Sequence, residues 1–218
     1  MQPFKIKICG VTTPGDAVSA AGAGADAIGL NFYERSLRSI KPDVALEIVT
    51  MIPKEIAVVG VFVNHDLQDI RDMAEHLQLA AVQLHGDESP EVIDELGLPN
   101  VIRAVRIAGN SSQELDTTQS EIEAWCQRGV SGILVDKAAG KSYGGSGKTF
   151  DWTVLEKLDI PVRTILAGGL TPENVAAAIE TAKPDAVDVA SGVEDLPGSK
   201  DKSLVGQFVR AAQKAFGQ

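Results

Sequence analysis

The sequence predicts a single-domain (β/α)8 barrel. Short runs rich in Val, Ile and Ala recur along the 218 residues, with helical stretches between them. The eight strand–helix units average about 27 residues, slightly less than the roughly 30 residues of a βαβ unit. Eight parallel units with right-handed connections can close into a ring. No linker or change of composition interrupts the chain, so we expect one domain over residues 1–218.

The expected strands are the apolar runs. In chain order they are Phe4–Cys9, Asp26–Phe32, Ile56–Val63, Ala80–His85, Val101–Ile107, Ser131–Asp136, Val162–Ala167 and Asp185–Ala190. The run Ile56–Val63 is almost entirely apolar, which is typical of a parallel strand that is buried on both faces. An open, doubly wound sheet is the competing architecture. That fold needs a glycine-rich phosphate loop after its first strand, and Cys9–Thr12 does not supply one.

The expected helices are identified by their caps and by apolar periodicity. Thr13, Pro14 and Asp16 suit the N-cap, the first helical position and the first turn of a helix. Ser89 and Thr171 are expected to cap helices in the same way. Further helices are predicted at 42–52, 66–78, 89–96, 151–158, 171–182 and 201–216, and in the second half of 111–127.

Composition and charge limit the partners. The net charge of −10 argues against a nucleic-acid partner, because no basic stripe offsets phosphate repulsion. No apolar run is long enough for a membrane span, and the N-terminus has no export signal. Two distant cysteines are typical of reduced thiols in a cytoplasmic protein. The three histidines form no metal-ligand spacing with them, so we expect no metal site.

The first strand carries a candidate nucleophile or base. Alternation places Lys5, Lys7 and Cys9 on one strand face, and nearby ammonium groups favour the thiolate. The alternative is that Cys9 packs as a small buried hydrophobe. Because barrel active sites lie at the C-terminal ends of the strands, Asp136 from the sixth strand is expected to face the same site. Desolvation would suit Asp136 to act as a general acid, unless Lys137 or Arg103 neutralises it.

Glycines at the ends of the last two strands predict an anion site. Gly168 and Gly169 let backbone N–H groups approach a phosphate, and Ser191-Gly192 could start a short helix beside them. The alternative for Gly168-Gly169 is a tight turn. His85 ends the fourth strand and either orients substrate or bonds a neighbouring loop. Asp188 is expected to pair with Lys5 or Lys7 inside the barrel.

The segment 138–149 looks like a nucleotide-binding loop but lacks one required glycine, since Ser142 stands at that position. We expect instead a lid over the barrel mouth, from which Lys141 or Lys148 could meet an anion.

Seven stretches, in order, resemble one family, phosphoribosylanthranilate isomerase, over the whole chain. They are Lys7–Gly10, Gly24–Gly29, Val59–Asn64, Val82–Glu88, Gly145–Trp152, Leu166–Leu170 and Val187–Glu194. The resemblance implies a cofactor-independent Amadori rearrangement of N-(5-phosphoribosyl)anthranilate in tryptophan biosynthesis. It implies that Asp136 is the general acid that opens the ribose ring and Cys9 the general base that removes the C2 proton. It also implies a phosphorylated small-molecule substrate and a monomer.

By the same resemblance, Arg38 meets the anthranilate carboxylate. Leu37 replaces a proline that is usual in the family, which would loosen the loop. Ala190 stands where the family often has a serine, and Ser146 where it has a threonine, and both of these changes are milder. Two other functions stay open on the sequence alone: isomerisation of a different phosphorylated ribosyl amine, and phosphate-ligand binding without catalysis. A metal-dependent epimerase is disfavoured because clustered histidines and carboxylates are lacking.

Overall fold

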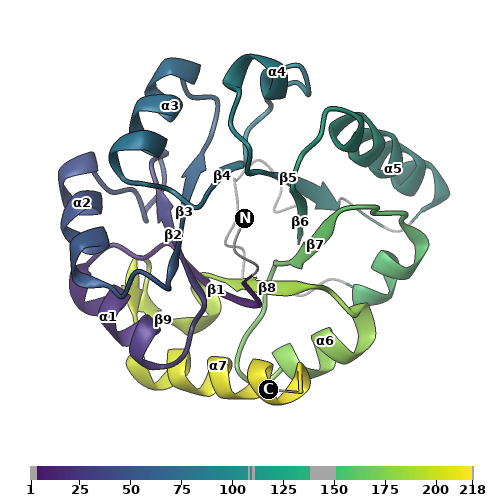
Figure 1. Cartoon of the computed structure of the whole chain (residues 1–218). Helices are drawn as coiled ribbons and strands as arrows, with labels where there is room; N and C mark the ends of the chain where they lie inside the picture. The colour runs from purple at the N-terminus through teal and green to yellow at the C-terminus, as the bar shows by residue number, and fades with distance from the viewer. Residues whose placement is uncertain (1–3, 108, 110, 138–150, 218) are drawn as a thin grey trace.

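The computed structural model describes residues 4–107, 109, 111–137 and 151–217. Eight parallel strands form a closed barrel in the order β1-β2-β3-β4-β5-β6-β7-β8, and β1 pairs with both β2 and β8. Helices surround the barrel on the outside (Figure 1). The predicted fold is confirmed, and the open sheet is excluded. The predicted lid at 138–149 lies outside the described residues.

Each strand lies inside its expected range or within one residue of it. The strands are β1 Ile6–Cys9, β2 Ala27–Asn31, β3 Ala57–Phe62, β4 Ala81–Leu84, β5 Val101–Ile107, β6 Gly132–Lys137, β7 Arg163–Leu166 and β8 Ala186–Val189. Burial explains this agreement, because nearly every strand residue is buried and the apolar runs therefore mark the strands directly.

The helices follow the strands in sequence and pack against their outer faces. They are α1 Pro14–Gly22, α2 Pro42–Met51, α3 Leu67–His76, α4 Val92–Leu96, α5 Ser112–Gln127, the 3-10 helix η1 Trp152–Lys157, α6 Val175–Ala182 and α7 Lys202–Ala215. The predicted Thr13 cap is confirmed, since its hydroxyl accepts from the Asp16 N–H at 3.1 Å. None of the helices in the described ranges is long and apolar enough to cross a membrane.

Three local predictions are wrong. Helix α5 fills the whole segment, because Ser111 and Glu114 form a capping box that starts it early. Helices α4 and α6 begin three and four residues later than predicted, so Ser89 and Thr171 are not their N-caps. A short antiparallel hairpin, β9 Glu194–Leu196 with β10 Ser199–Lys200, was not predicted and follows β8.

Two apolar regions fill the molecule. The larger lies between the strands and the helices and includes Ile6, Ile8 and Trp125. The smaller is rich in alanine and takes its residues from alternate strand positions, such as Ala27 and Ala186. Small side chains suit the narrow interior of an eight-stranded barrel. Polar side chains from the same inward-facing positions, nearer the C-terminal ends of the strands, form the site.

Candidate active site

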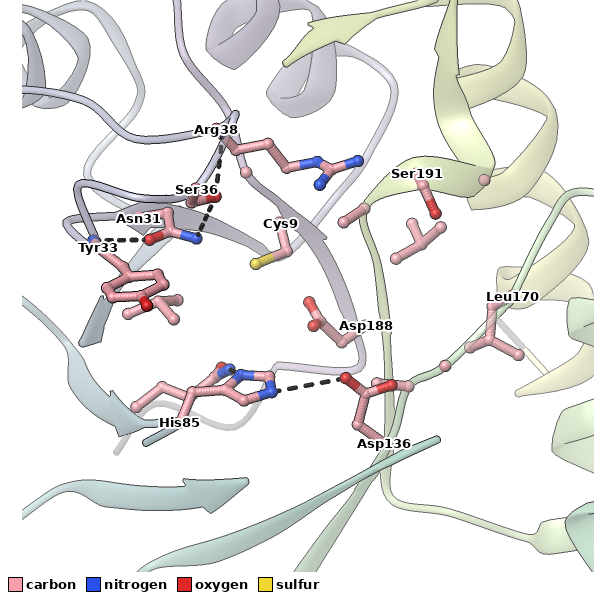
Figure 2. A pocket seen from close by; sticks show the side chains of 18 of the residues that line it. Cys9, Asn31, Tyr33, Ser36, Arg38, His85, Asp136, Leu170, Asp188 and Ser191 are labelled. Atoms are coloured by element: carbon pink, nitrogen blue, oxygen red, sulfur yellow. Dashed lines mark hydrogen bonds and ion pairs between the residues drawn. The ribbon is translucent and has the colours of Figure 1, made fainter. Parts of the chain in front are cut away.

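A pocket opens at the C-terminal ends of the strands and contains eight candidate site residues from the sequence. Those residues are Cys9, Arg38, His85, Asp136, Gly168, Gly169, Ser191 and Gly192. In Figure 2, Arg38 lies on one side of Cys9, and His85 and Asp136 lie on the other. The pocket therefore brings together groups from both halves of the chain.

Strand β1 presents Lys7 and Cys9 to the barrel interior, as alternation predicts. Lys7 is fully buried and donates from Nζ to Oδ1 of Asp188 at 2.8 Å, which confirms the predicted interior ion pair. A Cβ on Gly29 would lie 2.6 Å from Cys9 Sγ and 3.0 Å from Lys7 Nζ, so both side chains lie over this glycine. Lys5 is placed elsewhere, with its ammonium 5.3 Å from the centre of the Phe216 ring.

The expectation that two lysines keep Cys9 ionised is wrong. Burial raises the pKa of the Cys9 thiol, and the negative charge of Asp188 raises it further. Lys7 acts in the opposite direction but does not overcome the other two effects. Burial alone would lower the pKa of Lys7, yet the charge of Asp188 and its hydrogen bond raise it, so Lys7 stays charged. In the free protein the Cys9 thiol is therefore protonated at neutral pH.

Asp136 ends the buried part of β6 and faces His85. The backbone N–H of Lys137 donates to Oδ1 of Asp136 at 2.8 Å, and Nε2 of His85 lies 3.5 Å from Oδ2. Arg103 does not neutralise Asp136, because its guanidinium binds Glu88 and Glu121 and lies over the Trp125 ring.

The loop after β2 holds Arg38 through hydrogen bonds. The Ser36 hydroxyl accepts from the Arg38 backbone N–H at 3.1 Å and from Nδ2 of Asn31 at 3.2 Å. Oδ1 of Asn31 accepts from the Tyr33 N–H at 2.9 Å (Figure 2). Leu37 stands where the family usually has proline, which would loosen the loop. These hydrogen bonds hold the loop in place and offset that loss.

The Arg38 guanidinium binds Glu194 through two nitrogens. Nε donates to Oε1 at 2.8 Å and Nη2 to Oε2 at 2.6 Å, and this hydrogen bonding raises the pKa of Arg38. Lys200 also donates to Oε1 of Glu194, at 2.7 Å. Burial would raise the pKa of Glu194, but Arg38 and Lys200 lower it, so the carboxylate is charged. Burial lowers the pKa of Lys200, although the Glu194 carboxylate opposes this shift. With Lys200 charged, the two cations and one anion leave a local positive charge beside the pocket.

The glycines that follow β7 and β8 lie close to neighbouring backbone and side-chain atoms. Gly168 and Gly169 have φ values of +84° and +73°, which favour glycine. A Cβ on Gly168 would lie 2.9 Å from Oδ1 of Asp136, and one on Gly192 would lie 1.8 Å from the Leu170 carbonyl oxygen. The predicted short helix is a 3-10 turn, Ser191–Val193. Gly168 thus makes room for Asp136.

Sequence reasoning missed several polar residues of this region, among them Gln83, Glu194 and Lys200. Gln83 lines the pocket and lies two residues before His85, on the same face of the strand, so alternation could have identified it. Glu194 and Lys200 come from the unpredicted hairpin, whose strands are too short for a periodic pattern. Within the described ranges, no group of three or more His, Cys, Asp or Glu side chains could hold a metal ion.

Comparison with known proteins agrees with this geometry. A family model described as N-(5'-phosphoribosyl)anthranilate (PRA) isomerase matches residues 6–211. The N-(5'-phosphoribosyl)anthranilate isomerase of Trichlorobacter lovleyi is 40% identical over 214 residues, which is 98% of this chain and 100% of that protein.

Solved structures of the same family superpose on the chain. The phosphoribosyl anthranilate isomerase of Thermotoga maritima is 38% identical with a TM-score of 0.84, covering 97% of this chain and 99% of that one. A second structure holds reduced 1-(o-carboxyphenylamino)-1-deoxyribulose 5-phosphate, with 35% identity, a TM-score of 0.80 and the same coverage. Another describes monomers of the dimeric T. maritima protein, with 35% identity, a TM-score of 0.79 and the same coverage.

The match extends over nearly the whole length of both partners, and the fold agrees with it. The chain belongs to the N-(5'-phosphoribosyl)anthranilate isomerase family.

Proposed function

We propose that this isomerase of tryptophan biosynthesis carries out its reaction with Cys9 as general base and Asp136 as general acid. The reaction is the cofactor-independent Amadori rearrangement of N-(5-phosphoribosyl)anthranilate to 1-(2-carboxyphenylamino)-1-deoxyribulose 5-phosphate. The observation that carries the assignment is that a buried thiol and a buried carboxyl group, from β1 and β6, line one pocket. A thiol and a carboxyl group at two strand ends are what a two-step proton transfer needs.

Asp136 acts first. Oδ1 already accepts the Lys137 N–H, so Oδ2 carries the acidic proton and gives it to the ring oxygen of the ribose. The bond between C1 and the ring oxygen breaks, and the nitrogen lone pair forms the C1=N bond of a protonated Schiff base. Asp136 is left as a carboxylate.

Cys9 acts second. Its thiolate takes the proton from C2, the C1=C2 bond forms, and the C1=N electrons return to nitrogen to give a neutral enolamine. Moving the hydroxyl proton of C2 to C1 yields the ketone, so no atom is gained or lost. Because the pKa of Cys9 is raised, only a fraction of free molecules holds the thiolate at neutral pH. The cationic Schiff base beside the sulfur favours this form.

The same pocket supplies groups for the two anionic ends of the substrate. Glu194 engages Nε and Nη2 of Arg38, and among the described residues no hydrogen bond occupies Nη1. We assign Nη1 to the anthranilate carboxylate, supported by the net positive charge of the Arg38–Glu194–Lys200 cluster.

We assign the phosphate to backbone N–H groups of Gly168, Gly169 and Gly192, with the Ser191 hydroxyl beside them. Residues at the ends of β7 and β8 often bind phosphate in barrels of this kind. We assign to His85, which lies beside Asp136, the role of orienting the substrate.

The test is the loss of anthranilate-type fluorescence from freshly generated phosphoribosylanthranilate, with Cys9→Ala measured alongside. Rapid loss with the wild type and at least about 100-fold slower loss with Cys9→Ala would support the assignment. A wild type that binds the phosphorylated product but does not turn over the substrate would favour a binding protein or an isomerase of another ribosyl amine.

A monomeric state and a cytoplasmic location stay predictions. Sedimentation velocity tests the first, since the T. maritima relative is dimeric.

A further inference from the structure

We propose that Lys7 and Gln83 are positioning residues that fix the tautomer of His85, so that His85 directs an N–H at the acid, Asp136. Four side chains carry the proposal: Lys7 from β1, Gln83 from β4, His85 just after β4 and Asp136 from β6. The proposal rests on the acid role of Asp136 proposed above, and it adds how that acid is kept ready to release its proton.

The four side chains form one continuous polar chain across the barrel. Nζ of Lys7 lies 3.2 Å from Oε1 of Gln83, and Nε2 of Gln83 lies 3.2 Å from Nδ1 of His85. Nε2 of His85 lies 3.5 Å from Oδ2 of Asp136 (Figure 2). Lys7 is fully buried, Gln83 is 1% exposed and Asp136 is 7% exposed, so water competes little for these contacts.

The direction of each hydrogen bond follows from Lys7. An ammonium group has three donors and no acceptor, so the Gln83 atom that faces Lys7 must be the amide oxygen. The amide nitrogen then faces His85 and can only donate. Nδ1 of His85 must therefore accept, and a neutral imidazole that accepts at Nδ1 carries its proton on Nε2. Asp188 anchors the start of the chain by accepting from Lys7 at 2.8 Å.

The Nε2 atom of His85 lies near Asp136 without a good hydrogen bond to it. It is buried and has no hydrogen-bond partner among the described residues, and 3.5 Å to Oδ2 is too long for a good hydrogen bond. Since Lys137 already occupies Oδ1, Oδ2 is the oxygen that becomes negative when Asp136 releases its proton. An N–H beside it then gains a charge-assisted hydrogen bond that the protonated acid lacks.

The other tautomer would act against the reaction. It would present the lone pair of Nε2 to Oδ2, accept the acidic proton and hold it away from the ribose ring oxygen. Among the described residues Gln83 is the one partner of Nδ1, so it sets which neutral tautomer His85 adopts.

The tautomer can be measured directly because the chain has only three histidines, His65, His76 and His85. Long-range proton–nitrogen correlation spectra of the 15N-labelled protein at pH 7.5 distinguish a protonated ring nitrogen from an unprotonated one. His85→Asn identifies the His85 signals by their loss. We expect wild-type His85 to be neutral with its proton on Nε2.

Two variants at one position test the cause. Gln83→Met fills the same space without an amide, so we expect the His85 tautomers to mix and kcat to fall by roughly 10- to 100-fold at similar KM, the range of one hydrogen bond to a charged group. In Gln83→Glu the carboxylate beside Lys7 accepts from Nδ1–H, so we expect the reversed tautomer and a lower kcat still. Gln119→Met is the matched control, because its amide lies on α5 and bonds Glu123.

Each outcome of the tautomer and kcat measurements supports or overturns the proposal. A wild-type proton on Nδ1, or wild-type tautomer and kcat in both Gln83 variants, would overturn the proposal. A changed tautomer with unchanged kcat would also overturn it, while leaving the acid role of Asp136 intact. An active Asp136→Asn enzyme together with a tautomer set by Gln83 would instead show that the acid assignment, and not the polar chain, is at fault.

Discussion

The buried ammonium of Lys7 is paired with Asp188 at 2.8 Å, directly beside the Cys9 thiol. The pairing prevents Lys7 from acting as an unopposed positive charge on the sulfur. Burial and the Asp188 carboxylate therefore leave the pKa of Cys9 above its ordinary value.

A pH dependence follows from this pairing. Only the thiolate is a base, and a raised pKa means that its fraction at neutral pH is small. We expect the ultraviolet absorbance of the thiolate to be small at neutral pH and to increase as the pH approaches the raised pKa. The measurement uses Cys126→Ser, which leaves Cys9 as the only thiol. Full thiolate absorbance already at neutral pH would contradict a raised pKa.

Asp188→Asn tests the cause of the shift. It removes one of the two effects that raise the pKa of Cys9 and leaves Lys7, which lowers it. The alkaline rise in thiolate absorbance should then move to lower pH. Lys200 and Arg38 also carry charges that interact with the sulfur, so their pairing with Glu194 must be intact in the variant. A shift toward higher pH would contradict the assignment.

Gly168→Ala should damage catalysis more than folding. The new Cβ would lie 2.7 Å from the Lys137 nitrogen and 2.9 Å from Oδ1 of Asp136, which displaces the acid. We expect kcat to fall on the order of 100-fold, the effect of a misplaced catalytic group. Gly129→Ala is the control, since its φ of +86° is similar but nothing lies within 4 Å of the new Cβ. Both variants cost about 1–2 kcal/mol of folding free energy for the left-handed backbone. Equal kcat in the two would contradict this role of Gly168.

Glu194→Gln should weaken substrate binding. The amide keeps only one acceptor oxygen, so one of the two contacts that orient the Arg38 guanidinium is lost, and Lys200 loses its charged partner. We expect KM to rise by roughly 10- to 100-fold with little change in kcat, because Arg38 contacts ground state and transition state alike. Arg38→Ala should have the same signature in steady-state kinetics. A fall in kcat at constant KM would mean that Arg38 acts on the reacting atoms instead.

Ser111→Ala tests the early start of α5. The variant removes the capping box with Glu114 at the protein surface. We expect a loss of about 1 kcal/mol in unfolding free energy and a melting temperature about 2–4 °C lower. The kcat should be unchanged. Ser112→Ala, one residue inside the helix, should have little effect on either quantity. Equal destabilisation by the two changes would show that the cap contributes nothing specific.

The sequence was most informative where burial is uniform. The strands could be predicted because a run such as Ala57–Phe62 is buried on both faces and so contains only apolar residues. Strand ends then located Cys9 and Asp136 without any contact information. The first half of helix α5 was missed because it is solvent-exposed and has no apolar periodicity, and its start depends on a cap rather than on packing.

Contacts between distant segments could not be read from the sequence. Glu194 and Arg38 meet through a hairpin whose strands have three and two residues, too short for a periodic pattern. The ionisation of Cys9 was predicted with the wrong sign because Lys5 and Lys7 were counted as equivalent. In the structure the Lys5 ammonium lies over the Phe216 ring, and the Asp188 carboxylate balances the positive charge of Lys7.

The order of the two proton transfers is the central claim, and a kinetic isotope effect tests it most directly. Substrate with deuterium at C2 of the ribose is compared with ordinary substrate in Asp136→Asn and in Cys9→Ser. Ring opening limits the rate when the acid is impaired, so the isotope effect in Asp136→Asn should approach one. Removal of the C2 hydrogen limits the rate when the base is impaired, so Cys9→Ser should keep a large effect. A large effect in Asp136→Asn and none in Cys9→Ser would contradict the assigned roles.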